Sequence, residues 1–284
     1  MITYKREIKS ILVILSLFLM CQLNSQSLNY SGPNSFIINN NTPPTHLGAS
    51  LIPTTERAPS GMTFGDNGNK IYFLGSASDF VVQYSLSIPY DYSTRGPIED
   101  TFRVNGEETQ AQDVEFNDDG TRMYILGNQG DDVTEYSLSS AWNVSSATFT
   151  DTFDARAEIE SFLGATNGDL LTGMSFNDDG SKLYIADRRS DDVFEFDLST
   201  NYDVSTAGAV VNNLVIVGEN NVRDISFNDD GTALYVIGSS GDDVNTFPLS
   251  SSYDLSSVGT SSNHSLPGSP DNVPQAILID NNGT

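Results

Sequence analysis

The stretch Asp113-Val-Glu-Phe-Asn-Asp-Asp-Gly120 occurs four times along the chain in closely related form. The other copies are Gly61-Met-Thr-Phe-Gly-Asp-Asn-Gly68, Gly173-Met-Ser-Phe-Asn-Asp-Asp-Gly180 and Asp224-Ile-Ser-Phe-Asn-Asp-Asp-Gly231. Their phenylalanines lie 52, 60 and 51 residues apart, and an aromatic residue follows each of them after 26 residues. A constant first half and a second half of variable length are typical of a repeated unit with one solvent-facing loop.

Each repeat is predicted to form four antiparallel strands. An apolar run ends at the phenylalanine, and the Asn-Asp-Asp-Gly that follows is typical of a tight hairpin turn. The second run, such as Leu183-Tyr-Ile-Ala186, is almost wholly apolar, which predicts a strand buried on both faces. A third run follows a pair of acids, and a fourth follows a turn such as Tyr202-Asp-Val-Ser205. Residues 154–163 are predicted to form a short helix.

This pattern predicts an all-β fold, a β-propeller of four-stranded antiparallel blades. The repeats span about residues 61–112, 113–172, 173–223 and 224–275, and residues 276–284 match the start of a fifth. A β-sandwich is the alternative architecture, and an in-phase repeat of this length argues against it. We expect either a small closed propeller or a fragment of a larger one, and we favour the fragment because propellers with few blades are less common.

The repeat also resembles a known group of propellers. The pattern Phe-x-x-Asp-Gly-x-x-Leu-Tyr-Val resembles the repeat of the YVTN and TolB-like propeller group. With Asp-Asp-Val and Leu-Ser-x-x-Tyr-Asp-Val-Ser added, it is similar to repeats of bacterial surface and phage structural proteins. The resemblance covers about residues 61–284. It implies the propeller fold and leaves the activity open, because these families have mixed functions.

The first 26 residues are expected to be a secretory signal peptide. Three basic residues between positions 5 and 9 precede an apolar run of 11 residues, Ile11 to Cys21. That run is shorter than the roughly 20 residues that span a bilayer, and it fits a signal peptide. A lipoprotein acylated at Cys21 is the alternative, although Met20 does not fit that motif. Residues 27–60 are then a lead-in segment, and the mature chain is expected to be secreted, on the cell surface or periplasmic, without a transmembrane segment.

Composition excludes several classes of function. The chain of 284 residues has 38 acidic and 13 basic side chains and a net charge of −25, so a nucleic-acid partner is not expected. One cysteine excludes a disulfide framework and a cysteine-cluster metal site. The two histidines, His46 and His264, lie far apart in the sequence, and the chain has no Gly-x-Ser-x-Gly motif and no phosphate loop. We therefore assign no catalytic residue from the sequence.

Hairpin connectivity predicts which loops share a face of the propeller. The acidic pairs after each second strand and the residues that begin each innermost strand should meet at one end, which is the candidate ligand-binding face. Its residues are Gln112, Asp113, Arg223, Asp224, Asp131, Asp132, Asp191, Asp192, Asp242 and Asp243. A ring of carboxylates would attract Ca²⁺ or a cationic ligand. The alternative is that the paired acids only shape their turns.

The aromatic residues that follow each phenylalanine have two interpretations. They could stack on sugars, or they could plug the space between neighbouring blades. Their repetition together with Asp-x-Ser favours the structural plug. These residues are Tyr90, Trp142, Tyr202 and Tyr253.

Three functions fit the sequence. The leading one is a secreted or cell-surface, non-catalytic propeller that binds an extracellular protein, a glycan or Ca²⁺, or that serves in adhesion. The second is a hydrolase or lactonase with a metal-assisted carboxylate site in the channel. It predicts acids at equivalent inward positions, which here read Gly61, Asp113, Gly173 and Asp224, only half of them acidic. The third is a purely structural repeat array.

Overall fold

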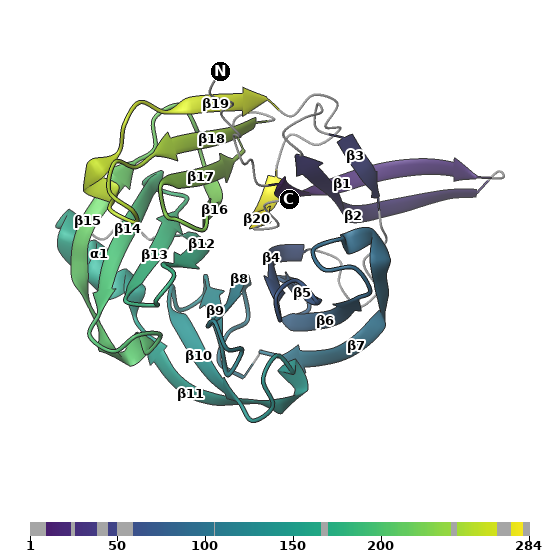
Figure 1. The fold of residues 1–284 in the computed structure, drawn as a ribbon, viewed down its shortest axis with the longest axis horizontal. Coiled ribbons are helices and arrows are strands. Elements are labelled where there is room, and N and C mark those ends of the chain that lie inside the picture. The colour runs from purple at the N-terminus through teal and green to yellow at the C-terminus, as the bar shows by residue number, and fades with distance from the viewer. Residues whose placement is uncertain are drawn as a thin grey trace, which may run out of the picture.

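The structure of the protein is a computed structural model. It describes residues 10–23, 26–38, 45–49, 59–104, 106–165, 170–239, 243–265 and 274–280. The fold is all-β, and each of the four repeats forms one four-stranded antiparallel sheet. These four sheets stand as blades around a central axis (Figure 1), so the prediction of four-stranded propeller blades is confirmed.

Within each blade the strands run from the axis outward in chain order. The strands of the first two blades are β4 (Pro59–Gly65), β5 (Lys70–Gly75), β6 (Phe80–Leu86), β7 (Arg95–Arg103), β8 (Ala111–Phe116), β9 (Arg122–Gly127), β10 (Val133–Leu138) and β11 (Ala147–Phe153). Those of the third and fourth blades are β12 (Leu171–Phe176), β13 (Lys182–Asp187), β14 (Asp192–Leu198), β15 (Ala207–Val215), β16 (Val222–Phe227), β17 (Ala233–Gly238), β18 (Asp243–Pro248) and β19 (Ser262–Ser265).

A fifth sheet fills the gap between the fourth blade and the first. It has the order β20-β1-β2-β3, with β20 (Pro274–Asp280), β1 (Ser10–Leu23), β2 (Gln26–Ile38) and β3 (Thr45–Ala49). Strand β20, the predicted start of a fifth repeat, contacts both β16 and β4, so the innermost strands form a closed ring (Figure 1).

The signal peptide remains a prediction. The structure places residues 10–23 in β1, whereas residues 1–9, 24 and 25 lie outside the described part of the chain. In the described residues, no helix has both the length and the apolar character needed to cross a membrane.

The hydrophobic core lies in layers between neighbouring blades. Tyr124 and Leu126 of β9, for example, pack with Met174 and Leu183 of the next blade, and all four are fully buried. Burying one such side chain contributes roughly 1.5–3 kcal/mol. Because each blade is covered on both sides, its second strand is apolar along nearly its whole length.

Tyrosine hydroxyls of the second strands also join one blade to the next. Each hydroxyl donates a hydrogen bond to the main-chain carbonyl of the aromatic turn residue in the following blade. These pairs are Tyr72 with Trp142 at 2.8 Å, Tyr124 with Tyr202 at 2.6 Å, and Tyr184 with Tyr253. The aromatic residue at the turn is therefore held by the blade before it.

The predicted helix is present as α1 (Ala155–Leu163). The Asp154 carboxylate caps its first turn by accepting the Ala157 N–H at 3.0 Å, and Gly164 ends it in the left-handed conformation. Arg156 of α1 forms an ion pair of 2.9 Å with Asp131. The helix thus fastens the link between the second and third blades to a turn of the second.

Candidate functional site

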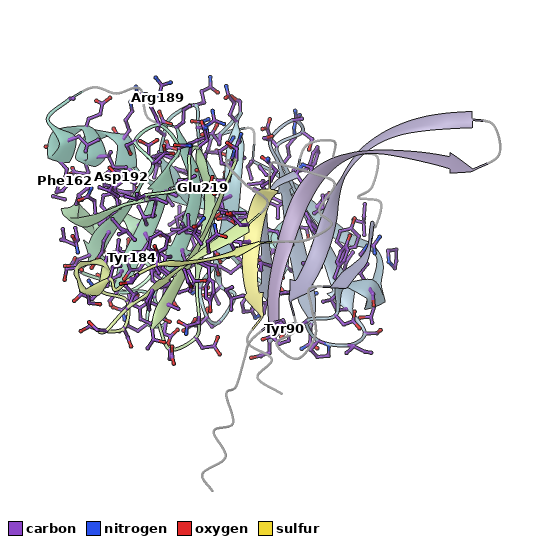
Figure 2. The ribbon with its side chains drawn as sticks, turned by 90° about the horizontal axis from the view of Figure 1, so that it is seen from above. Tyr90, Phe162, Tyr184, Arg189, Asp192 and Glu219 are labelled. Carbon is purple, nitrogen blue, oxygen red and sulfur yellow. The ribbon has the colours of Figure 1, made fainter. Side chains whose placement is uncertain are left out.

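The ring has two chemically different faces. At the upper face the innermost strands begin, and the turns between the second and third strands of each blade lie here. At the lower face the innermost strands end in the Asn-Asp-Asp-Gly turns. Arg189 marks the upper face and Tyr90 the lower face in the side view (Figure 2).

The lower face opens into a cavity of about 300 Å³. Its walls include the four repeated phenylalanines, Phe64, Phe116, Phe176 and Phe227. The residues just before them, one step further into the ring, also line it, and these are Thr63, Glu115, Ser175 and Ser226. A hollow of this size, lined by polar side chains around a layer of aromatic rings, suits a small molecule.

Glu115 is the only charged residue of that inner layer, where the other three repeats have hydroxyl side chains. The Thr63 hydroxyl donates a hydrogen bond of 3.1 Å to Oε2 of Glu115. Alternate residues of a strand point the same way, so Glu115 and Asp113 of β8 face the same channel. Burial and the charge of Asp113 raise the pKa of Glu115 well above its ordinary range.

Asp113 and Asp224 join innermost strands across blade boundaries. Oδ2 of Asp113 accepts the N–H of Met174 at 2.8 Å, and Oδ2 of Asp224 accepts the N–H of Ile277 at 2.7 Å. In each aspartate, Oδ1 accepts the N–H of the following residue at 2.8 Å. Both oxygens of each buried carboxylate therefore have main-chain donors.

Burial also raises the pKa values of these two aspartates. The pKa of Asp113 is raised to about 7, and that of Asp224 is raised well above its ordinary value. The charges of Asp113 and Glu115 add to the effect of burial on Asp224. The three carboxyl groups thus compete for negative charge, and we expect at least one of them to keep a proton near neutral pH.

The half-acidic pattern of the inward positions has a steric cause. A Cβ atom on Gly173 would lie 2.5 Å from Oδ1 of Asp224, and one on Gly61 would lie 2.7 Å from Oδ1 of Asp113. Each aspartate therefore requires a glycine at the equivalent position of the preceding blade. Only two of the four inward positions are acidic because the packing allows one aspartate for every two blades.

The aromatic residues at the rim act as clamps between blades. The Tyr202 hydroxyl lies 2.8 Å from Oδ1 of Asp118, in the preceding blade, and 2.9 Å from the Asp178 carbonyl oxygen, in its own, so its one proton is shared between these acceptors. Tyr253 makes the equivalent bonds one blade further on, to the Asp178 carboxylate and to the Asp229 carbonyl. These contacts favour the structural plug over sugar stacking.

The rings of these aromatics are also covered by their turns. A Cβ atom on Gly120 would lie 2.2 Å from the Trp142 ring, and Gly68, Gly180 and Gly231 make equally close approaches to their tyrosines. All four glycines have positive φ, from 64° to 79°, so the turn needs glycine for its backbone as well as for its packing.

The predicted ligand face is the upper face, opposite the cavity. Asp131 there pairs with Arg156, Oδ1 of Asp191 accepts the Val222 N–H at 3.2 Å, and Asp243 accepts a hydrogen bond from Asn263. These acids hold their own surroundings together, in line with turn-shaping roles.

The other predicted residues of that face are more dispersed. Burial, with the charges of Glu108 and Asp154, raises the pKa of Asp132 to about 6, and burial also raises the pKa of Asp192. Gln112 donates to the Gln110 carbonyl at 3.1 Å, and Asp242 lies outside the described residues. Ligand binding by this set as a whole stays a prediction.

Calcium binding also stays a prediction. Among the residues that the structure describes, no group of three or more His, Cys, Asp or Glu side chains is arranged to hold a metal ion. Asp113 and Asp224, the most central acids, direct their oxygens at main-chain N–H donors.

Glu115 is the functional candidate that sequence reasoning did not select. The available signal was its departure from the repeat, because Thr63, Ser175 and Ser226 occupy the equivalent positions. Its direction into the cavity follows only once the registers of β8 and β9 are known.

No protein-family model and no curated protein matches this chain. Solved structures do match it. One is described as a "putative 6-phosphogluconolactonase" from Bacteroides uniformis, with 13% identity and a TM-score of 0.50 over 91% of this chain and 72% of that one. The periplasmic gluconolactonase PpgL of Pseudomonas aeruginosa has 13% identity and a TM-score of 0.50 over 96% and 70%. The β-propeller domain of Myceliophteria thermophila Cps50 (Swd1) has 11% identity and a TM-score of 0.50 over 83% and 67%.

These likenesses show a shared β-propeller fold. The lactonases among them contradict the leading prediction of a non-catalytic binding or adhesion propeller, and they favour its alternative, a lactonase-type propeller. That prediction is therefore wrong. It took the absence of familiar motifs as a sign of no catalysis. The YVTN and TolB-like grouping and secretion remain predictions.

Proposed function

We propose that this protein is a hydrolase of lactonase type that opens a small, uncharged cyclic ester in the cavity of the lower face. The observation that carries the proposal is Glu115, a carboxyl group of raised pKa that lines the cavity among three hydroxyl groups. A carboxyl group tuned toward neutral pH is suited to general acid–base work. The lactonases among the structural neighbours support this reading.

The chemistry requires one water molecule and one proton carrier. In its ionised form Glu115 takes a proton from water as the water oxygen attacks the ester carbonyl carbon. The hydroxyl groups of Ser175 and Ser226 line the same layer and can donate hydrogen bonds to the carbonyl oxygen as it gains charge. The bond to the ring oxygen then breaks, Glu115 returns the proton to that oxygen, and the product is an open hydroxy acid.

The surroundings of the cavity favour an uncharged substrate. Asp66, Asp118, Asp178 and Asp229 lie among its lining residues, and the chain carries a net charge of −25. Such a field repels anions. The partly exposed rings of Phe64 and Phe176 offer some apolar surface to the C–H faces of a sugar ring. A neutral sugar lactone therefore fits this mouth better than a phosphorylated one.

The proposal is tested by following the hydrolysis of glucono-1,5-lactone in a pH-stat. The purified protein should accelerate the reaction above the buffer rate, and Glu115→Gln should lower the catalysed rate by about 10²–10⁴-fold. Glu158→Gln on α1 removes a carboxylate from a site outside the cavity and should leave the rate unchanged.

Two results would overturn this function. One is a Glu115→Gln variant that hydrolyses the lactone as fast as the wild-type protein. The other is a folded wild-type protein that fails to accelerate the hydrolysis of glucono-1,5-lactone and of other uncharged lactones.

We also propose that the protein works in the periplasm or outside the cell. The basic and apolar pattern of residues 1–26 supports this, as does the periplasmic location of the neighbour PpgL. N-terminal sequencing of the protein recovered from the native cell should find a start close to residue 27. A start at residue 1 or 2 in the mature protein would contradict export through a cleaved signal.

A further inference from the structure

Arg223 departs from the repeat at the upper end of the ring. It stands in β16 directly before Asp224, where the other three blades have Ser60, Gln112 and Thr172. In the first and third blades this position serves to join strands, since Ser60 and Thr172 donate to carbonyls of the next innermost strand at 2.9 Å. In β16 a long cation replaces these hydroxyl groups.

Arg188 lies at the same junction between the third and fourth blades. It directly follows β13, a strand that contacts β16, and its N–H donates to the Leu170 carbonyl at 3.0 Å. The guanidinium groups are close enough for the charge of Arg188 to add to burial in lowering the pKa of Arg223. Two cations are thus held together in a strongly acidic protein.

The acid next to Arg188 is committed to main-chain donors. Asp187 is fully buried, and its carboxylate accepts main-chain N–H groups of Leu170, Arg189 and Ser190 at 2.9 to 3.2 Å. Within the described residues, neither Arg188 nor Arg223 takes part in an ion pair. The Nε atom of Arg223 is buried and has no hydrogen-bond acceptor.

By contrast, other cations of the blades have carboxylate partners. Arg122 pairs with Glu135 at 2.8 Å, Arg156 with Asp131 at 2.9 Å, and Lys182 with Asp197 at 2.9 Å. A buried donor left without an acceptor is costly, and two neighbouring guanidinium groups repel each other. A bound anion would relieve both costs at once.

We propose that Arg188 and Arg223 form a binding site for a small oxyanion, a phosphate, sulfate or carboxylate group, at the upper face of the ring. Guanidinium groups present planar sets of N–H donors that match the oxygens of such groups. The site lies at the opposite end of the ring from the cavity, and its existence does not depend on the proposed lactonase activity.

The site is tested by titrating the full-length protein with inorganic phosphate, sulfate or gluconate in a calorimeter, at constant ionic strength set with chloride. We expect saturable binding of at least one of these ions. Arg223→Met and Arg188→Met should each weaken it by about tenfold or more, because each removes charge-assisted hydrogen bonds. Arg189→Met, which removes an exposed charge next in sequence, should bind like the wild type.

Comparing the three ions shows which kind of oxyanion the site prefers. Preference for gluconate indicates a carboxylate ligand, and preference for phosphate or sulfate indicates a tetrahedral one. Glu115→Gln should retain the affinity, which separates this site from the cavity. Binding of none of the ions above the chloride background, or equal losses in Arg189→Met and Arg188→Met, would overturn the proposal. Should Arg223→Met fail to fold, Arg188→Met with its Arg189→Met control decides alone.

Discussion

At the scale of single residues, the carboxyl groups in the channel are buried, and burial opposes their ionisation. Asp113 has a pKa raised from 3.8 to about 7 by burial, so the folded protein binds this proton more tightly than the unfolded chain does. Protonation of Asp113 therefore stabilises the fold. That contribution is complete below about pH 4 and is lost as the pH rises through about 7.

We expect the free energy of unfolding to fall as the pH is raised from 5 to 8. Asp113→Asn should make this decline shallower, because the amide cannot ionise. The variant loses one carboxylate acceptor and should be less stable at pH 5, so the slope with pH is the decisive quantity. Urea unfolding at several pH values measures it.

Glu158→Gln serves as the matched control and should keep the wild-type slope, since Glu158 lies on α1 away from the channel. A wild-type protein whose stability rises between pH 5 and 8 would contradict this account. So would an Asp113→Asn variant with an unchanged slope.

At the scale of elements, glycine and aspartate alternate between the innermost strands of successive blades. Each carboxylate of Asp113 and Asp224 reaches the strand of the next blade and occupies space vacated by a glycine of the blade before. Strands β4 and β12 thus present glycine where β8 and β16 present aspartate. The sequence repeats with every blade, whereas the packing of the innermost strands repeats with every second blade.

Gly173→Ala should destabilise the protein by about 1–3 kcal/mol, because its methyl group would overlap the Asp224 carboxylate and backbone. Gly208→Ala, in the outer strand β15, places its methyl group 3.7 Å from the nearest atom and should change stability by less than about 0.5 kcal/mol. Chemical denaturation of both variants measures the difference. Equal stabilities for the two variants would remove the steric basis of the alternation.

The elements were predictable to the extent that the repeat encodes them. The second strands appear where the apolar pattern predicts them, and β15 begins at Ala207, close behind the turn Tyr202-Asp-Val-Ser205. A short turn of helix at Val204–Thr206 leads directly into it. The side chain of Asp203 caps that turn by accepting the Ser205 N–H at 3.2 Å, a local bond that strand patterns do not reveal.

The site was harder to predict than the fold. The sequence directs attention to acids, and the acids of the upper face are mostly committed to turns. Arg223 was among the residues predicted for the ligand face, whereas Glu115 was not. Both are single exceptions at positions whose meaning depends on strand register. Without a register, a strand residue cannot be assigned to the channel or to a blade interface.

At the scale of the whole molecule, the ring depends on β20. This strand lies between β16 and β4, and its Ile277 N–H is held by Asp224. Ala276 and Leu278 belong to the core layer against the first blade. Strand β20 therefore joins the fourth blade to the first.

Removal of residues 274–284 should open the ring. We expect a lower melting temperature and association of the shortened chains, since the removal exposes the apolar faces of two blades and strand edges that invite pairing. Size-exclusion chromatography with light scattering and a melting curve measure both effects. A shortened chain that stays monomeric and melts like the full-length protein would show that closure contributes nothing to stability.

The alternation of glycine and aspartate has a parity that the ring cannot satisfy. The five innermost strands present Gly61, Asp113, Gly173, Asp224 and Ala276 in turn, and an odd circle cannot alternate without one mismatch. The mismatch falls between β20 and β4, where two small residues meet and neither position supplies a carboxylate. One seam of an otherwise evenly linked ring is thus chemically distinct, and it adjoins the sheet in which β20 pairs with β1.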